Sequence, residues 1–428
     1  MNIKVKGGQV ISGEIFPSGS KNSAVAIIPA TILFDKPVRL ENIPNIKDVD
    51  RLVKIMEKLG SKIRWNRQEE YMEIDNMNLR FEGLDKEDLG NMKGTALLWG
   101  PMLARFGKVS FRELPGGCTL GIRPLDAHYE AFKELGVVVK EGPNSAEMDA
   151  TDAVAHDLWL TEMSPTATEN IITLASVLPG KTKITGAASE PQVQDLCNFL
   201  VKSGVKISGI GSDILEIEGT RNLTPVTHRI LSDHYEITTY LALAAATHGK
   251  IKIKNAIPEM FPHINHIFSK FGVKVEYEGD TAVLDGKHKI NIHGSDCGET
   301  MAVKAQPWPS LPVDTLPLFI PLALAAPGGQ VLFHNWMYES GLFWTTELTK
   351  MGANIVICDP HRVIVNAGQK LRGATIEAPY IIRAVVSLVM TALIADGEST
   401  ILNADALYRG HPKFVENLKK LGVKIEES

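Results

Sequence analysis

One segment of this chain combines residues suited to chemistry on an anion. Leu114–Pro124, LPGGCTLGIRP, places Cys118 behind Gly116–Gly117 and a few residues before Arg123. A thiol becomes reactive when it is accessible and close to a cation, and adjacent glycines give a loop the freedom to open and close. A free cysteine is also commonly a small apolar packing residue. The segment therefore allows two interpretations of Cys118, a reactive thiol or a packing residue.

Three other polar sites stand beside apolar segments. Lys21 and Asn22 lie in GSKNSA, where a turn opens an apolar helix. A helix start and a lysine together attract anions, although a solvated lysine is the simpler interpretation. Arg383 interrupts the apolar run IIRAVVSLVM, and because a buried arginine is costly without a partner, a bound carboxylate or phosphate would supply one. Asp314 of LPVD precedes an apolar helix, which it could cap.

The composition limits the kinds of molecule that the chain handles. The net charge is −5, with 44% apolar and 22% charged residues, so we expect no nucleic-acid partner. The four cysteines form no CxxC pair, and the sequence shows no metal-ligand spacing, which fits a reducing compartment. The first residues lack the apolar core of a signal peptide, and the apolar runs are too short to span a bilayer. We therefore expect a cytoplasmic protein with no membrane partner.

A short phrase that contains glycine returns along the chain. It reads IMEKLGSKI at Gly60 and FLVKSGVKI at Gly204. Similar phrases surround four more glycines, Gly136, Gly272, Gly352 and Gly422, at intervals of 68 to 80 residues. Each phrase is typical of the end of an amphipathic helix, a glycine in a left-handed cap, and a following β-strand. The phrase therefore predicts six structural repeats.

A more apolar helix precedes each phrase and leads into a short strand. Examples are TALLWGPMLARFGKVSFREL at 95–114 and VVSLVMTALIADGESTILNA at 385–404. Such helices are apolar on nearly all sides, so we expect them to be buried, with sheet as the outer wall. Six units of helix, strand, helix and strand divide naturally into two domains of three.

The repeats and several segments together resemble the enolpyruvyl transferases. The resemblance covers essentially the whole chain and is closest in SGEIFPSGSKNSA, LENIPNIKDVD, LPGGCTLGIRPLDAH and SEPQVQDLCNFL. It implies an α/β fold, a two-domain inside-out α/β barrel built from six helix-strand-helix-strand units. Residues 1–20 plus 231–428 would form the first domain, and residues 21–230 the second, which carries the cysteine loop. The active site would lie in the cleft between them.

The resemblance also implies an activity. Members of the family transfer the enolpyruvyl group of phosphoenolpyruvate to a hydroxyl group and release phosphate. The branch most similar to this sequence uses UDP-N-acetylglucosamine as the acceptor, in peptidoglycan precursor synthesis, and is the target of fosfomycin. The reaction needs an anion clamp, an acid for C3 of phosphoenolpyruvate, a base for the hydroxyl and exclusion of water. The two substrates are the expected small-molecule partners, and no cofactor or metal is implied.

Individual residues match functional positions of the family. Catalytic roles fall on Cys118 as proton donor, on Asp314 as base and on Lys21. The residues that match phosphoenolpyruvate-binding positions are Lys21, Asn22, Arg123, Arg383 and Arg409. Those that match acceptor-binding positions are Lys93, Arg123, Pro124, Leu125, Asp126, His128, Ser164, Asp314 and Met337. Asp126 and His128 also fit an ordinary helix start.

Four positions depart from the family pattern. Lys93 stands near an arginine position and lacks the bidentate fork of arginine. Glu162 replaces a lysine beside the diphosphate of the acceptor. Ile381 replaces the aspartate that pairs with the arginine matching Arg383. Gly341 stands near the position of an arginine that helps to bind the carboxylate of phosphoenolpyruvate.

These departures leave three interpretations of the function open. The chain transfers enolpyruvyl to UDP-N-acetylglucosamine with local compensation, or it is a paralogue with another acceptor, such as a nucleoside monophosphate, in a secondary pathway. The third interpretation is a non-catalytic binding or regulatory paralogue. The third interpretation is disfavoured because five residues match functional positions of the family: Lys21, Cys118, Arg123, Asp314 and Arg409.

Overall fold

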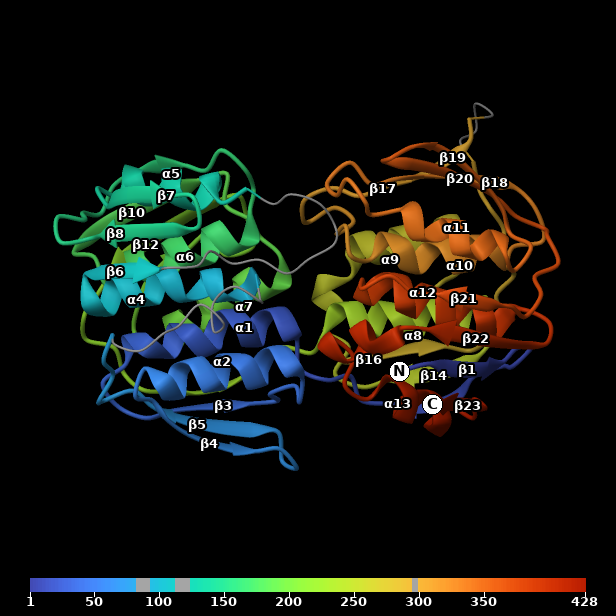
Figure 1. Cartoon of the computed structure of the whole chain (residues 1–428), viewed down its shortest axis with the longest axis horizontal. Helices are drawn as coiled ribbons and strands as arrows, with labels where there is room; N and C mark the ends of the chain where they lie inside the picture. The colour runs from blue at the N-terminus through green and yellow to red at the C-terminus, as the bar shows by residue number, and fades with distance from the viewer. Residues whose placement is uncertain (82–92, 112–123, 295–298) are drawn as a thin grey trace. The chain divides into compact units, whose positions relative to one another are not determined.

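The structure, a computed structural model, describes residues 1–81, 93–111, 124–294 and 299–428 of the chain. The chain divides into two compact units (Figure 1). Residues 1–18 and 232–428 belong to unit 1, and the described residues between 19 and 231 belong to unit 2. Among the helices that the structure describes, none is long and apolar enough to span a membrane.

One strand arrangement returns in the sheets of both units. A sheet in unit 2 has the order β11 (Lys206–Ser208), β12 (Ile214–Gly219), β10 (Gly180–Thr185) and β9 (Leu158–Trp159). β9 and β10 are parallel, and the other two pairs are antiparallel. Helix α6 (Pro165–Ala175) joins β9 to β10, because parallel neighbours need a crossover connection. Each repeat is thus a β-α-β crossover followed by a helix and a hairpin.

The other sheets of unit 2 follow this arrangement with one difference. The first consists of β13 (Thr227–Arg229), β3 (Val38–Glu41), β5 (Tyr71–Asp75) and β4 (Lys62–Asn66), in that order. The second consists of β6 (Lys108–Phe111), β8 (Ser145–Asp149) and β7 (Val138–Gly142). In this second sheet the described residues supply antiparallel pairs alone.

The described residues of unit 1 form three four-stranded sheets. The first is β2 (Ser12–Ile15), β14 (Lys250–Ile253), β16 (Thr281–Leu284) and β15 (Glu276–Glu278). The second is β17 (Met301–Lys304), β18 (Gln330–His334), β20 (Arg362–Asn366) and β19 (Asn354–Asp359). The third is β21 (Thr375–Glu377), β22 (Glu398–Leu402), β1 (Ile3–Lys6) and β23 (Ile425–Glu427). In the third sheet the N-terminal strand β1 completes the last repeat, between β22 and β23.

In the described residues the chain passes between the units after Ser18 and after Leu231, and a strand lies next to each passage. β2 precedes helix α1 (Lys21–Ala30) but pairs in parallel with β14, whereas β13 precedes helix α8 (His234–Ala246) but pairs in parallel with β3. Backbone hydrogen bonds join the two passages. The N–H of Asp233 donates to the carbonyl of Ser18 (2.9 Å), and that of Ser20 donates to the carbonyl of Leu231 (2.7 Å).

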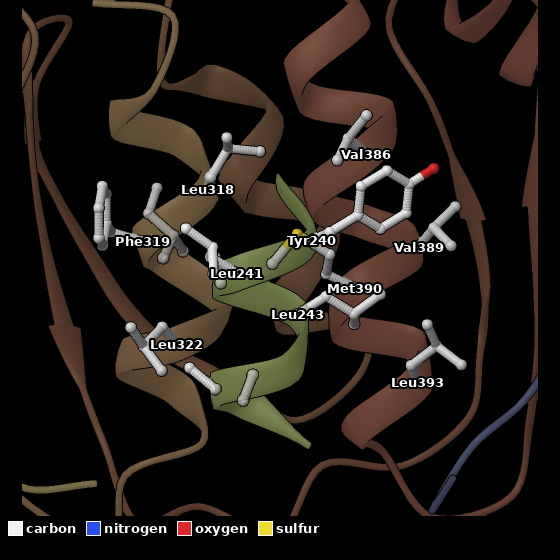
Figure 2. Packing of buried hydrophobic residues seen from close by; sticks show 14 of the residues in the cluster. Tyr240, Leu241, Leu243, Leu318, Phe319, Leu322, Val386, Val389, Met390 and Leu393 are labelled. Carbon is white, nitrogen blue, oxygen red and sulfur yellow. The ribbon is translucent and has the colours of Figure 1, made fainter. Parts of the chain in front are cut away.

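Among the described helices, three in each unit are buried on nearly all sides. In unit 1 they are α8, α10 (Phe319–Leu324), which follows the 3-10 turn η4 (Leu316–Leu318), and α12 (Ile382–Ile394). In unit 2 they are α1, α4 (Trp99–Phe106), which follows the 3-10 helix η2 (Lys93–Leu98), and α6. Figure 2 shows the side chains of α8 between those of α10 and α12. The predicted α/β fold of buried helices and outer sheets is confirmed (Figure 1).

Six amphipathic helices end in the recurrent glycine phrase. They are α2 (Lys47–Lys58), α5 (Asp126–Glu134), α7 (Pro191–Lys202), α9 (Pro262–Lys270), α11 (Thr346–Thr349) and α13 (Phe414–Lys420). The glycines of all six phrases have positive φ, from 72° at Gly272 to 106° at Gly204. At Gly204 its N–H donates to Val201 (3.0 Å) and the N–H of Val205 donates to Leu200 (3.1 Å), which is a Schellman ending. The predicted left-handed caps are therefore confirmed.

Four further 3-10 turns complete the described elements. They are η1 (Thr31–Leu33), η3 (Pro258–Met260), η5 (Phe343–Thr345) and η6 (Ala404–Arg409). η6 contacts α12, one of the three buried helices of unit 1.

We expect Gly60→Ala to destabilise unit 2 more than Gly204→Ala. Both glycines have similar φ, 100° and 106°, and left-handed strain costs an alanine about 1–2 kcal/mol at either position. A Cβ at position 204 would lie 3.9 Å from the carbonyl of Asn222, whereas a Cβ at position 60 would lie 2.7 Å from the carbonyl of Asn78. Urea unfolding measures the difference, and equal losses in the two variants would contradict this explanation.

A buried carboxyl group lies where the chain passes between the units. Glu236 of α8 is fully buried, and its Oε2 accepts a hydrogen bond from the backbone N–H of Ser18 (3.0 Å). Burial, and then repulsion by Asp233, raises the pKa of Glu236 to about 7, from an ordinary value of 4.5. Between these two values the folded state keeps a proton that the unfolded state has lost. Stability therefore falls as the pH rises through this range and stays lower above it.

We expect Glu236→Gln to remove this pH dependence while keeping an acceptor for Ser18. Its gain in unfolding free energy over the wild type should grow from about pH 4.5 to about pH 7, to an upper limit of about 3 kcal/mol. Denaturant titrations across this range measure the gain, with the exposed Glu259→Gln as the control. A gain that does not change with pH would show that Glu236 does not titrate in this way.

Candidate active site

Many of the predicted site residues stand at the starts of the buried helices. In unit 2, Lys21 is the first residue of α1, Lys93 begins η2, and Ser164 is the N-cap of α6. In unit 1, Asp314 lies in the turn before η4, and Arg383 is the second residue of α12. Helix starts present backbone N–H groups and the positive end of the helix dipole, so they favour anions.

Interactions within each unit connect several of the segments that carry these residues. In unit 2, the amide of Asn170, on α6, accepts from the N–H of Gly100 on α4 (2.7 Å) and donates to the carbonyl of Ala96 on η2 (2.9 Å). In unit 1, the charges of Arg383 and Asp314 both act on His234, the first residue of α8. Each unit therefore brings polar side chains from several chain segments together.

Lys21 is held by an ion pair. Its Nζ lies 2.6 Å from Oδ2 of Asp48 on α2, and the two side chains are 17% and 10% exposed. Ser20 caps the helix by accepting the N–H of Ser23 (3.2 Å), and Asn22 is half-buried beside Lys21. The lysine is thus an ordered, largely buried cation rather than a solvated one.

A hydrogen-bonded chain links His128 to the start of α6. His128 is buried, and its Nε2 lies 3.1 Å from Oγ1 of Thr166, which lies 3.4 Å from Oγ of Ser164. Its Nδ1 lies 3.0 Å from Nδ2 of Asn170. Its ring also packs edge-on against Trp99, with centroids 5.5 Å apart.

The partners of Asn170 determine the tautomer of His128. Because its amide oxygen accepts from Gly100 and its nitrogen donates to Ala96, the orientation of the amide is fixed. The second N–H of that nitrogen then donates to Nδ1 of His128, so the imidazole proton lies on Nε2 and is donated to Thr166. The hydroxyl proton of Thr166 is left for Ser164 or for a ligand.

Thr166 and Asn170 were not among the site residues predicted from the sequence. A polar pair, Glu169-Asn170, inside the otherwise apolar helix PTATENIITLA was the available signal. Buried amides persist in apolar helices where they satisfy backbone groups, and Asn170 satisfies two. Asn170 also holds the ring of His128, which is distant in the sequence, beside Thr166 at the start of α6.

Arg383 is buried and forms no ion pair with a carboxylate of the described residues. Its side chain is 8% exposed, and its guanidinium carbon lies 4.7 Å from the centre of the Tyr235 ring. Its Nη1 donates to Nε2 of His411. Within the described part of the chain, Nε has no hydrogen-bond partner and no carboxylate lies within ion-pair distance. The charge is therefore buried, and an anionic ligand would compensate it.

Two histidines near Arg383 were missed. His234 is buried, and neither ring nitrogen has a hydrogen-bond partner among the described residues. Burial, and then the charge of Arg383, lowers the pKa of His234 to about 3, against an opposing effect of Asp314. His234 is thus neutral at neutral pH. His411 lies two residues after Arg409, a position that the resemblance had marked.

The remaining predicted residues are less tightly enclosed. Thr315, rather than Asp314, is the N-cap of η4, so the alternative role of Asp314 as its cap is wrong. Arg409 is half-buried, with its guanidinium carbon 5.2 Å from the centre of the Tyr380 ring. Met337 is 37% exposed. At the start of α5, Pro124 and Asp126 are exposed and Leu125 is half-buried.

Cys118 and Arg123 both lie outside the described residues. In the part of the chain that is described, no group of three His, Cys, Asp or Glu side chains is arranged to hold a metal ion.

The departures from the family pattern have local structural settings. Glu162 is exposed, two residues before the N-cap of α6. A Cβ at Gly341 would lie 2.2 Å from Nδ2 of the buried Asn335, so a larger residue would require a local rearrangement. Ile381 is the N-cap of α12 and provides no side-chain cap.

We expect Asn170→Leu to destabilise the protein by about 3 kcal/mol or more, because it leaves three buried polar groups without their amide partner. Thr166→Val removes one hydroxyl from the same network and should cost about 1 kcal/mol. Denaturant unfolding compares the two variants. A loss in Asn170→Leu no larger than that in Thr166→Val would contradict the network described here.

Comparison with known proteins relates this fold to a family of transferases. A sequence model of EPSP synthase (3-phosphoshikimate 1-carboxyvinyltransferase) matches residues 5–418. The structure is similar to the enolpyruvyl transferase NikO from Streptomyces tendae, with a TM-score of 0.86 and 21% identity over 100% of this chain and 98% of that chain. It is also similar to EPSP synthase from Acinetobacter baumannii, with a TM-score of 0.75 and 15% identity over 99% of each chain.

Curated relatives match over nearly the full length. The UDP-N-acetylglucosamine 1-carboxyvinyltransferase of Borreliella burgdorferi is 37% identical over 99% of this chain and 98% of its own. The protein of the same name from Bradyrhizobium diazoefficiens is 39% identical over 99% of this chain and 97% of its own. Fold, repeats and sequence agree, and this chain belongs to the EPSP synthase family of enolpyruvyl (1-carboxyvinyl) transferases, as the resemblance of its sequence predicted.

Proposed function

We propose that the protein transfers the enolpyruvyl group of phosphoenolpyruvate to a hydroxyl group of UDP-N-acetylglucosamine and releases phosphate. The observation that carries this proposal is the match of 37–39% identity, over the full chain, to transferases named for that acceptor. The buried charge of Arg383, which forms no ion pair with a carboxylate of the described residues, supports an anionic substrate. The proposed setting is peptidoglycan precursor synthesis in the cytoplasm, where reduced cysteines without CxxC pairs are expected.

The chemistry assigns a role to each matching residue. Lys21, Arg123, Arg383 and Arg409 bind the phosphate and carboxylate of phosphoenolpyruvate, with Asn22 beside them. Cys118 supplies the proton that adds to C3, and Asp314 accepts the proton of the acceptor hydroxyl as its oxygen bonds to C2. The tetrahedral intermediate then loses a proton from C3, and the C2–O bond to phosphate breaks, which restores the double bond. Cationic groups that are already in place lower the barrier because they need no reorganisation.

The acceptor would be held at the start of α6 and α5. Ser164 and His128 are connected through Thr166, and the fixed tautomer of His128 orients that hydroxyl. The same proposed acceptor-binding set also includes Lys93, Pro124, Leu125, Asp126, Asp314 and Met337.

Glu162 favours a second candidate, transfer to an acceptor without a diphosphate. A carboxylate at this position would repel a diphosphate, but Glu162 is exposed, and solvent limits such a repulsion to about 1 kcal/mol. The exposure of Glu162 therefore makes the expected loss of diphosphate affinity smaller than the charge reversal alone suggests. A nucleoside monophosphate is the acceptor class to compare.

An acceptor panel tests the two candidates. We expect phosphate release from phosphoenolpyruvate with UDP-N-acetylglucosamine and little with UMP or shikimate 3-phosphate. Glu162→Lys should tighten UDP-N-acetylglucosamine binding by about fivefold, the equivalent of about 1 kcal/mol. Faster turnover of UMP would favour the second candidate, and no turnover of any acceptor would remove the proposal of transferase activity on these substrates.

We expect Cys118→Ala to abolish turnover near neutral pH and to leave the melting temperature unchanged, because the variant lacks the proton donor to C3. Cys118→Asp keeps a proton donor that fosfomycin cannot alkylate as a thiol. It should therefore retain activity and resist fosfomycin. The buried Cys197, on α7, gives the control variant Cys197→Ala, which should keep fosfomycin sensitivity. Full activity in Cys118→Ala would remove this role of the thiol.

A further inference from the structure

The buried charge of Arg383 is oriented by a neutral partner. Its Nη1 donates to Nε2 of His411, and its guanidinium lies over the face of Tyr235, 4.7 Å from the ring centre. No carboxylate of the described residues forms an ion pair with it. The usual partner of a buried arginine is a carboxylate, so an imidazole in that place needs an explanation.

The hydrogen bond itself determines the state of His411. A guanidinium group only donates hydrogen bonds, so Nε2 of His411 must carry the lone pair. The imidazole that bonds Arg383 in this way is neutral, with its proton on Nδ1. A protonated imidazole would present an N–H to the guanidinium and lose the bond.

The fold holds His411 rigidly. Its residue is fully buried, and its backbone N–H donates to the carbonyl of Leu407 on η6 (3.0 Å). Its ring packs against Phe414 of α13, with centroids 5.8 Å apart. The imidazole can therefore fix the direction of the guanidinium.

A neutral acceptor and a carboxylate have different effects on Arg383. Both restrict the rotamer, but a carboxylate also cancels the positive charge in a poorly solvated site. An imidazole restricts the rotamer and leaves the charge for a ligand. Ile381, at the start of the same helix, likewise brings no competing carboxylate.

We infer that His411 is a positioning residue that orients Arg383 toward the anion of phosphoenolpyruvate while leaving its full charge for that anion. The identity of the anion rests on the proposed function, whereas the arrangement of Arg383 and His411 does not. His411 acts through Arg383 and does not itself contact substrate.

Two variants of His411 separate orientation from packing. His411→Leu fills similar space without an acceptor, and should raise the KM and the Kd for phosphoenolpyruvate about tenfold or more, the effect of one hydrogen bond to a charged group. The KM for the acceptor should stay within twofold. His411→Gln places an amide oxygen near the former Nε2 and should restore the phosphoenolpyruvate affinity to within about threefold of the wild type.

A second histidine provides the control. His288 bonds the carbonyl of Ala245, at the opposite end of α8 from His234, so His288→Gln should leave the Kd for phosphoenolpyruvate unchanged. Melting temperatures identify any variant that fails to fold. Imidazole ¹⁵N shifts of the wild type should show the Nδ1–H tautomer of His411, and this readout is independent of whether His411→Leu folds.

The results distinguish this inference from the proposed function. Calorimetric titration with phosphoenolpyruvate alone measures affinity whether or not any acceptor is turned over. An Nε2–H or doubly protonated His411, or wild-type affinity in a folded His411→Leu, would overturn the positioning role. If the His411 variants change phosphoenolpyruvate affinity as expected but the wild type does not turn over UDP-N-acetylglucosamine, the proposed acceptor is overturned instead.

Discussion

Every residue of α8 is buried, and the same need to remove apolar helices from water shapes the rest of the molecule. A helix that is apolar all round has no face to leave in solvent, so each unit packs three such helices together and surrounds them with sheet. The β-α-β crossover suits this arrangement because the helix that connects two parallel strands packs back onto the sheet that those strands form. Strand β2, which precedes α1 in the sequence, completes the sheet of β14 in unit 1. Strand β13, which precedes α8, completes the sheet of β3 in unit 2.

Several of the predicted site residues stand at the starts of these enclosed helices. Lys21, Ser164 and Arg383 stand there, where unsatisfied N–H groups and the helix dipole favour anions. Two different solutions keep the cations ordered. Lys21 has the carboxylate of Asp48, whereas Arg383 has the neutral imidazole of His411. The second solution leaves a charge in a buried place, which stabilises the free protein less and favours an anionic ligand more.

Much of the fold could be predicted from the sequence, because its signals are local. The glycine phrase predicts a helix end by itself, and an apolar helix predicts its own burial. The networks around His128 and Arg383 could not be predicted in this way. Asn170 and His411 matter through partners that are distant in the chain and meet only when the sheets assemble. Arg383 was recognisable because a charge in an apolar run is anomalous within its own segment.

The claim that a substrate anion compensates the buried Arg383 is tested most directly by ligand-induced stabilisation. The melting temperature of the wild type and of Arg383→Met is measured with and without saturating phosphoenolpyruvate. Binding to the folded state alone raises the melting temperature. The account predicts a clear rise for the wild type and almost none for Arg383→Met. Equal rises in the two proteins would show that the anion binds without Arg383 and would contradict the account.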